Sequence, residues 1–104
     1  MIAIVDPNQL NDILATEVRP VIVVCLDIKT DIGKFKTLLS EVTDTCLEEV
    51  RICVLDAEYV NVMAKFNIHG TPSASFCHKG KGKDTFLGQM DSDDLVFFLK
   101  KNLT

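Results

Sequence analysis

The reactive side chains of this chain include four cysteines, so thiol chemistry is the first chemistry to consider. Between successive cysteines there are 20, 6 and 23 residues, for Cys25, Cys46, Cys53 and Cys77. No pair has the C-x-x-C spacing that dithiol exchange, a zinc site or haem attachment uses. The spacing therefore provides no dithiol, zinc or haem motif.

The surroundings of the cysteines divide them into two groups. Cys25, Cys53 and Cys77 each lie in an apolar, strand-like run, where a free cysteine behaves as a small hydrophobic residue. We predict buried free thiols there, in keeping with a reducing compartment. A bridge or redox switch between strands, through a Cys25/Cys53 or Cys25/Cys77 pair, is the alternative. Residues 43–49 are polar around Cys46, so we expect Cys46 to be the most exposed thiol and the candidate redox thiol.

Other catalytic and metal-binding patterns are weak. His69 and His78 have no second His, Cys or carboxylate at ligand spacing, so no metal site is predicted. Asp27 ends an apolar run, and a surface role is favoured over general-base catalysis. Spacing supports no Ser/His/Asp or Cys/His arrangement. We predict no catalytic residue, cofactor or metal, and an enzymatic role stays open only through a non-standard cysteine.

Length and composition limit the class of protein. A chain of 104 residues that is 47% hydrophobic is expected to form one domain over residues 1–104. Its net charge of −4 argues against a nucleic-acid surface. The basic run 78–83 is Gly-spaced and predicts a hairpin turn. The longest apolar run, Val21–Leu26, is too short for a bilayer, and the N-terminus lacks a basic leader. We expect a cytoplasmic protein that binds neither nucleic acid nor membrane.

Hydrophobic periodicity predicts the element order βαβαβαββα. Strands are expected at 2–5, 21–26, 51–56, about 73–78 and about 83–87. Helices are expected at 7–17, from a cap at Thr30 or Asp31 onward, at 59–66, and from Asp91 or Ser92 onward. Asp6 and Pro7 provide an N-cap and a favourable first helical residue. The continuous hydrophobicity of Val21–Leu26 indicates a strand covered on both faces.

A three-residue segment that ends in proline, together with the elements around it, resembles the pattern of a known family. Gly70-Thr71-Pro72 precedes an apolar run, and a helix start around Thr30–Gly33 follows the strand 21–26. Together with Asp56 after the third strand and Gly88 before the last helix, this order resembles the thioredoxin family over essentially the whole chain. The resemblance implies a thioredoxin-like α/β fold, three-layered α/β/α with a central mixed five-stranded sheet, and a cis peptide bond before Pro72.

The redox motif of that family is missing. Its four positions fall on Thr30, Asp31, Ile32 and Gly33, with no thiol among them. The attacking cysteine is replaced by Thr30, whose hydroxyl has a pKa far above neutral, and the resolving cysteine by Gly33. Thiol–disulfide exchange requires a thiolate and a second thiol. The resemblance therefore implies the fold without its usual chemistry.

Other family positions have changed in the same direction. The buried aspartate falls on Val24 and its lysine partner on or near Val54. The tryptophans beside the motif fall on Leu26 and Lys29, and the helix-kinking proline falls on Leu38. An unpaired buried charge costs several kcal/mol, so it persists only where function requires it. Aliphatic replacements are what loss of the redox role permits.

The function implied by the resemblance is binding. In this family the residue before the cis-proline presents its backbone to an extended peptide, which is β-type pairing without chemistry. We therefore predict a non-redox adaptor or chaperone-like module for a protein or extended peptide. The predicted groove consists of Lys29, Thr30, Asp31, Ile32, Gly33, Thr71, Pro72 and Gly88. Three alternatives stay open: a thiol-disulfide oxidoreductase or redox sensor using a non-standard cysteine, an anion at the helix start, which the Asp31 charge disfavours, and a proline that serves the fold alone.

Overall fold

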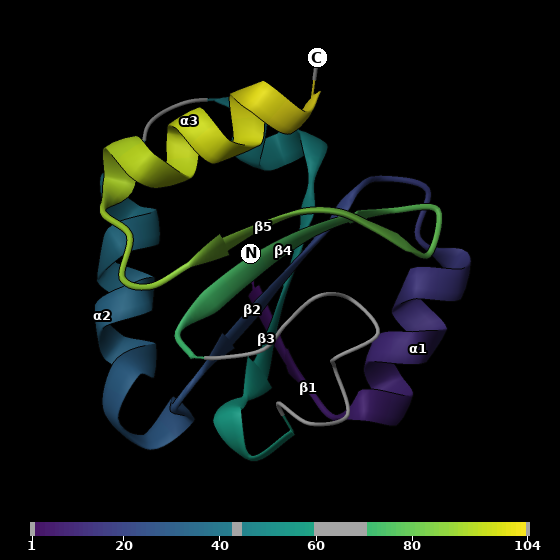
Figure 1. Cartoon of the computed structure of the whole chain (residues 1–104), viewed down its shortest axis with the longest axis horizontal. Coiled ribbons are helices and arrows are strands. Elements are labelled where there is room, and N and C mark those ends of the chain that lie inside the picture. The colour runs from purple at the N-terminus through teal and green to yellow at the C-terminus, as the bar shows by residue number, and fades with distance from the viewer. Residues whose placement is uncertain (1, 43–44, 60–70, 104) are drawn as a thin grey trace.

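The computed structural model describes residues 2–42, 45–59 and 71–103 (Figure 1). Five strands form one mixed sheet in the order β1-β3-β2-β4-β5, with β1, β3 and β2 parallel and β4 and β5 antiparallel. The strands are β1 Ile2–Val5, β2 Val21–Leu26, β3 Arg51–Asp56, β4 Ser73–His78 and β5 Lys81–Leu87. The helices are α1 Pro7–Thr16, α2 Ile28–Glu41, η1 (a short 3₁₀ helix) Thr45–Glu49 and α3 Ser92–Leu103. The predicted α/β class and five-stranded sheet are confirmed, while most of the predicted helix 59–66 lies outside the described residues.

Helices cover both faces of the sheet (Figure 1). On one face, α2, η1 and α3 pack over a core that includes Ile22, Val24 and Phe76. On the other face, Leu10 and Leu14 of α1 pack over Val21, Val23, Cys25 and their neighbours. Successive strand side chains point to opposite faces, so β2 contributes to both cores. All six residues of β2 are buried, which confirms the prediction from its unbroken hydrophobicity.

Local capping fixes the start of two helices. The Asp6 carboxylate accepts from the Gln9 backbone N–H at 2.8 Å, and the Gln9 side chain accepts from the Asp6 N–H at 2.9 Å. Asp91 and Asp94 form the same reciprocal pair at the start of α3, at 2.8 and 3.1 Å. Each pair satisfies backbone donors that have no partner within a helix, so both helices begin where the sequence predicts.

The β4–β5 hairpin is tighter than predicted. Its turn consists of Lys79 and Gly80, which have φ values of 54° and 77°. Two consecutive positive φ values suit a two-residue hairpin because they match the twist of the strands. Consequently β5 begins at Lys81, two residues before the predicted start at 83, and part of the basic run belongs to the strand.

Polar contacts join α3 to β5. The Asn102 side chain donates to the Asp84 carboxylate at 3.0 Å, and Lys101 pairs with that carboxylate at 3.1 Å. Lys83 Nζ donates to the Asn102 carbonyl at 2.7 Å, near the C-terminal end of α3. The contacts with Asn102 and Lys101 lower the pKa of Asp84 below its ordinary 3.8, with the Asn102 hydrogen bond as the largest cause. None of the helices in the described ranges is long and apolar enough to cross a membrane.

Candidate functional site

Three separate segments meet at one end of the sheet. The first is the junction where β2 leads into α2. The second is Thr71–Pro72, which leads into β4 and whose peptide bond is cis. The third is the end of β5, where the Gly88 N–H donates to the Pro72 carbonyl at 2.8 Å. The strand register joins them, because Ser73 pairs with Cys25 of β2 on one side and with Leu87 of β5 on the other.

The start of α2 differs from the prediction. The helix begins at Ile28 and is capped by Asp27, whose carboxylate accepts from the Lys29 N–H at 3.0 Å. The prediction of a cap at Thr30 or Asp31 was therefore wrong, since both lie within the first turn. Asp27 is also a favourable cap residue, and β2 ends directly before it. The carboxylate of Asp27 thus has a structural role at the surface.

The first-turn amides of α2 are already occupied. Asp56 of β3 accepts from the Ile28 N–H at 3.1 Å, and the Asp27 carbonyl accepts from the Thr30 and Asp31 amides at 3.3 and 2.8 Å. A helix N-terminus attracts anions through its unpaired N–H groups and its dipole. Here protein oxygens occupy the amides and two carboxylates lie beside the positive end. The arrangement therefore weighs further against an anion at this position.

Beneath the meeting point lies a cavity of about 90 Å³. Three residues of the predicted groove line it, namely Asp31, Pro72 and Gly88. Of the other groove residues, Lys29, Thr30 and Thr71 are exposed, and Ile32 packs against the core. Gly33 lies in a separate surface depression along α2. Of the predicted groove residues, those on the Pro72 side of α2 therefore adjoin the cavity.

Next to Gly88, β5 ends in a residue for which the sequence predicted no role. Leu87 is the last residue of β5 and is 63% exposed, although it is large and apolar. It pairs with Ser73 and immediately precedes Gly88, which has a φ of 98°. Contiguous apolar surface marks binding sites, so the exposed Leu87 matters here only together with the apolar cavity beside Pro72. The only sequence signal was an apolar residue directly before the glycine.

Comparisons with known proteins bear on the fold. No protein-family model matches the chain, and no curated protein matches its sequence. Among solved structures, a mutant thioredoxin from Halobacterium salinarum superimposes with a TM-score of 0.70 at 13% identity, over 96% of this chain and 88% of that one. The chain has a thioredoxin-like fold. A designed protein is also similar, with a TM-score of 0.71 at 16% identity, over 98% of this chain and 97% of that one.

The two positions at which the resemblance places the family's buried charges hold valines that face each other in the sheet. Val24 and Val54 are partners in the β2–β3 register, and both are buried in the core beneath α2 and α3. The side chains at these two positions therefore provide no proton donor or acceptor below the start of α2. Neither can serve as the general base that would activate a nucleophile there.

Cys46 is buried, which contradicts the prediction that it is the most exposed thiol. It is 6% exposed and packs in the core beneath α2 and α3. Its neighbours in η1, Thr45, Glu48 and Glu49, are exposed. A short helix with polar residues outward turns its one small apolar side chain inward, so a polar segment hides this thiol.

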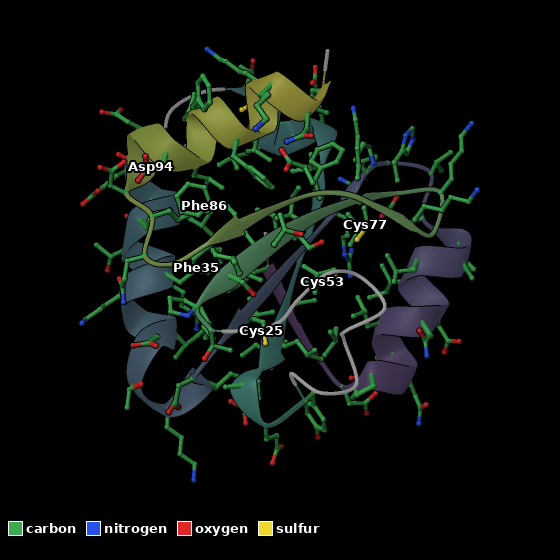
Figure 2. The ribbon with its side chains drawn as sticks, in the orientation of Figure 1. Cys25, Phe35, Cys53, Cys77, Phe86 and Asp94 are labelled. Carbon is green, nitrogen blue, oxygen red and sulfur yellow. The ribbon has the colours of Figure 1, made fainter. Side chains whose placement is uncertain are left out.

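The other three cysteines are buried free thiols, as predicted. They lie on the α1 side of the sheet, opposite Phe35 and Phe86 (Figure 2). Burial raises the pKa of Cys25 to about 11, with a further contribution from the Asp56 charge, and burial also raises the pKa of Cys53 and Cys77. The reactive form of cysteine is the thiolate, so burial disfavours the reactive form of these three thiols near neutral pH.

Strand register also separates these thiols. Cys53 lies opposite Val23, two residues from Cys25, and Cys77 lies opposite Val21. From strand spacing, the Cα atoms of Cys25 and Cys53 are about 8 Å apart, and those of the other two pairs are more than about 9 Å apart. A disulfide needs Cα atoms within about 7 Å, so no pair can be bridged without backbone movement.

Metal ligands are not gathered in the part of the chain that the structure describes. Within it, no three His, Cys, Asp or Glu side chains are placed to hold a metal ion. His78 is exposed at the end of β4. His69 lies outside the described residues.

Proposed function

We propose that this chain is a non-redox, thioredoxin-like protein that binds a protein or an extended peptide. The binding site is the groove between the start of α2, the Thr71–Pro72 segment and Gly88. One observation carries the proposal: the cavity beside this groove is lined largely by apolar side chains, with Leu87 exposed next to Gly88, whereas the chain's thiols are buried. It retains a surface for binding and lacks an activated group for thiol chemistry.

The form of the ligand follows from the elements at the rim. Thr71 is exposed directly before β4, and β5 forms an edge of the sheet. An extended segment can pair its backbone with such a sheet margin and place alternate side chains in pockets. The charges beside the groove are mixed, with Lys29, Asp31 and Lys34 on α2. A partner with a strong net charge of either sign is therefore disfavoured.

The alternative function is thiol-disulfide oxidoreductase or redox sensor, through Cys46 or a pair among Cys25, Cys53 and Cys77. Burial of all four thiols and the separation imposed by register support binding over this alternative. The buried, unbridged thiols of Cys25, Cys53 and Cys77 also support a reducing compartment, so a cytoplasmic location belongs to the proposal.

Peptide display with three forms of the protein tests the proposal. Thr71→Arg places a long cation in the groove. Thr16→Arg is the matched control, because Thr16 is exposed at the C-terminal end of α1, beside the Lys79–Gly80 turn. Circular dichroism confirms that all three forms are folded. We expect the wild type and Thr16→Arg to select the same peptides and Thr71→Arg to lose them.

Two results would overturn the proposed function. One is a failure of the wild type to select any peptide, or an equal selection by all three forms. The other is reduction of insulin by the wild type in dithiothreitol above the uncatalysed rate, because a non-redox protein has no thiolate to drive that exchange.

A further inference from the structure

The cavity below Pro72 is lined mainly by apolar side chains. Its walls come from β2, α2, β4 and the segment before α3 (Figure 1). The interior side chains are Val24, Leu26, Phe35, Leu38, Ala74 and Met90. Among the described residues, the polar side chains of the lining besides Ser73 are Asp31, which is half-buried, and Lys34 and Gln89, which are exposed. A guest therefore meets an apolar interior and a polar rim.

One small residue accounts for the empty space. Ala74 lies in register between Val24 of β2 and Phe86 of β5, in the middle of the sheet. The neighbouring row on the same face holds Ile22 and Phe76, both large and fully buried. Protein interiors are normally close-packed, so a methyl group in a row of large side chains leaves a hollow.

The hollow offers no buried hydrogen-bond partner among these side chains. Ser73 Oγ is buried without a hydrogen bond and belongs to a residue that lines the cavity. However, Ser73 is the register partner of Cys25, and that face of the sheet is the α1 side. Its hydroxyl therefore points away from the cavity. A polar guest would lose its hydrogen bonds to water without replacement, so the cavity selects an apolar group.

The volume limits the size of that group. An apolar cavity of about 150 Å³ admits benzene, and this one measures about 90 Å³. A branched aliphatic side chain fits such a space, whereas an aromatic ring does not. Pro72 and Gly88 belong to both the cavity and the adjoining groove. The groove would therefore hold the backbone of the ligand whose side chain enters the cavity.

We propose that this cavity receives one leucine-sized aliphatic side chain of the peptide bound in the groove, which makes that residue the anchor of recognition. The inference rests on the proposed function and adds its specificity. Aliphatic anchors are selected, aromatic anchors are rejected by size, and charged anchors are rejected by desolvation. A larger side chain of the protein that occupies the cavity should remove the preference for an aliphatic anchor.

Two measurements test the anchor. In the first, isobutanol is titrated into the wild type, Ala74→Val and Ala3→Val, and methyl resonances are followed by NMR. Ala74→Val fills the cavity, and Ala3→Val makes the same change in β1 on the α1 side. We expect saturable shifts of the Leu26, Leu38 and Met90 methyls in the wild type and the control, and none in Ala74→Val.

In the second, the three proteins are exposed to heptapeptide pools with random flanks and a central Leu, Ala or Phe. We expect the wild type and Ala3→Val to retain the Leu pool at least about tenfold more strongly than the Ala pool, since burying three extra carbons is favourable. They should also retain it more strongly than the Phe pool, since an aromatic ring is too large for the cavity. Ala74→Val should lose this preference. Equal retention of the three pools by the wild type refutes the anchor alone. Isobutanol binding without retention of any pool refutes the proposed function and the anchor with it.

Discussion

A larger side chain that occupies the cavity should stabilise the protein, and Ala74→Val introduces such a side chain. Valine adds two carbon atoms at a buried position of a central strand, where β-branched residues are favoured. Burying two carbons contributes about 1.6 kcal/mol at about 0.8 kcal/mol each. The cavity sets the upper limit, because about 90 Å³ at about 24 cal/mol per Å³ is about 2 kcal/mol.

Part of that gain is offset by close contacts with Val24 and Phe86, since added carbons in a packed core usually cause some strain. We expect a net increase in the free energy of unfolding of about 1 kcal/mol. For a domain of this size, that raises the melting temperature by about 4–8 °C. Urea unfolding followed by circular dichroism should show a higher midpoint with an unchanged slope.

Ala3→Val is the control, because it adds the same atoms at a half-buried position of the edge strand β1. Its free energy of unfolding should change by less than about 0.5 kcal/mol. A melting temperature of Ala74→Val below that of the wild type would mean that the walls already contact Ala74. The cavity would then be too small for an aliphatic side chain, and the anchor inference would fail together with this prediction.

Three further predictions concern the thiols, the start of α2 and α3. The four cysteines of the native protein should resist Ellman's reagent at pH 7.5 and react only after unfolding in urea. Rapid labelling of one thiol in the native state would contradict the burial of the four cysteine side chains. The double variant Thr30→Cys with Gly33→Cys should fold, because a Cβ at Gly33 has nothing within 4 Å. The carboxylates of Asp27 and Asp56 beside the amides should hold the pKa of the Cys introduced at position 30 at or above about 8.5. Alkylation rates measured against pH test this expectation, and an apparent pKa below about 7 would disprove it. Asp84→Asn should lower the free energy of unfolding by up to about 1 kcal/mol at pH 7. Because the folded pKa of Asp84 lies below 3.8, this difference from the wild type should shrink as pH falls through that folded pKa. Urea unfolding at pH 7 and pH 2 measures the difference, and a constant difference would exclude a role for the Asp84 charge.

Local sequence determined the elements whose signals lie within a few residues. Asp6 with Gln9, and Asp91 with Asp94, are reciprocal caps three residues apart, so α1 and α3 could be placed from the chain alone. The unbroken apolar run of β2 likewise requires cover on both faces. These features depend on periodicity and neighbouring side chains, which the order of residues specifies directly.

Long-range contacts decided the rest of the site. The sequence offered several caps for α2, and the helix begins at Ile28, whose amide binds Asp56 from a strand 28 residues later. Cys46 lies in a polar segment, yet its burial depends on how η1 packs against the core. The exposed Leu87 follows from a register that no local pattern expresses.

The sequence by itself determined that this fold lacks its dithiol and that its former charged positions are aliphatic, because residue identity alone decides which groups can ionise or attack. Only the tertiary structure decided that the thiols are buried, that carboxylates occupy the helix start, and that a largely apolar cavity lies beneath Pro72 beside Ala74. Burial, hydrogen bonding and empty volume are properties of residues brought together from β2, α2, β4 and the segment before α3. They exist only once those elements are packed.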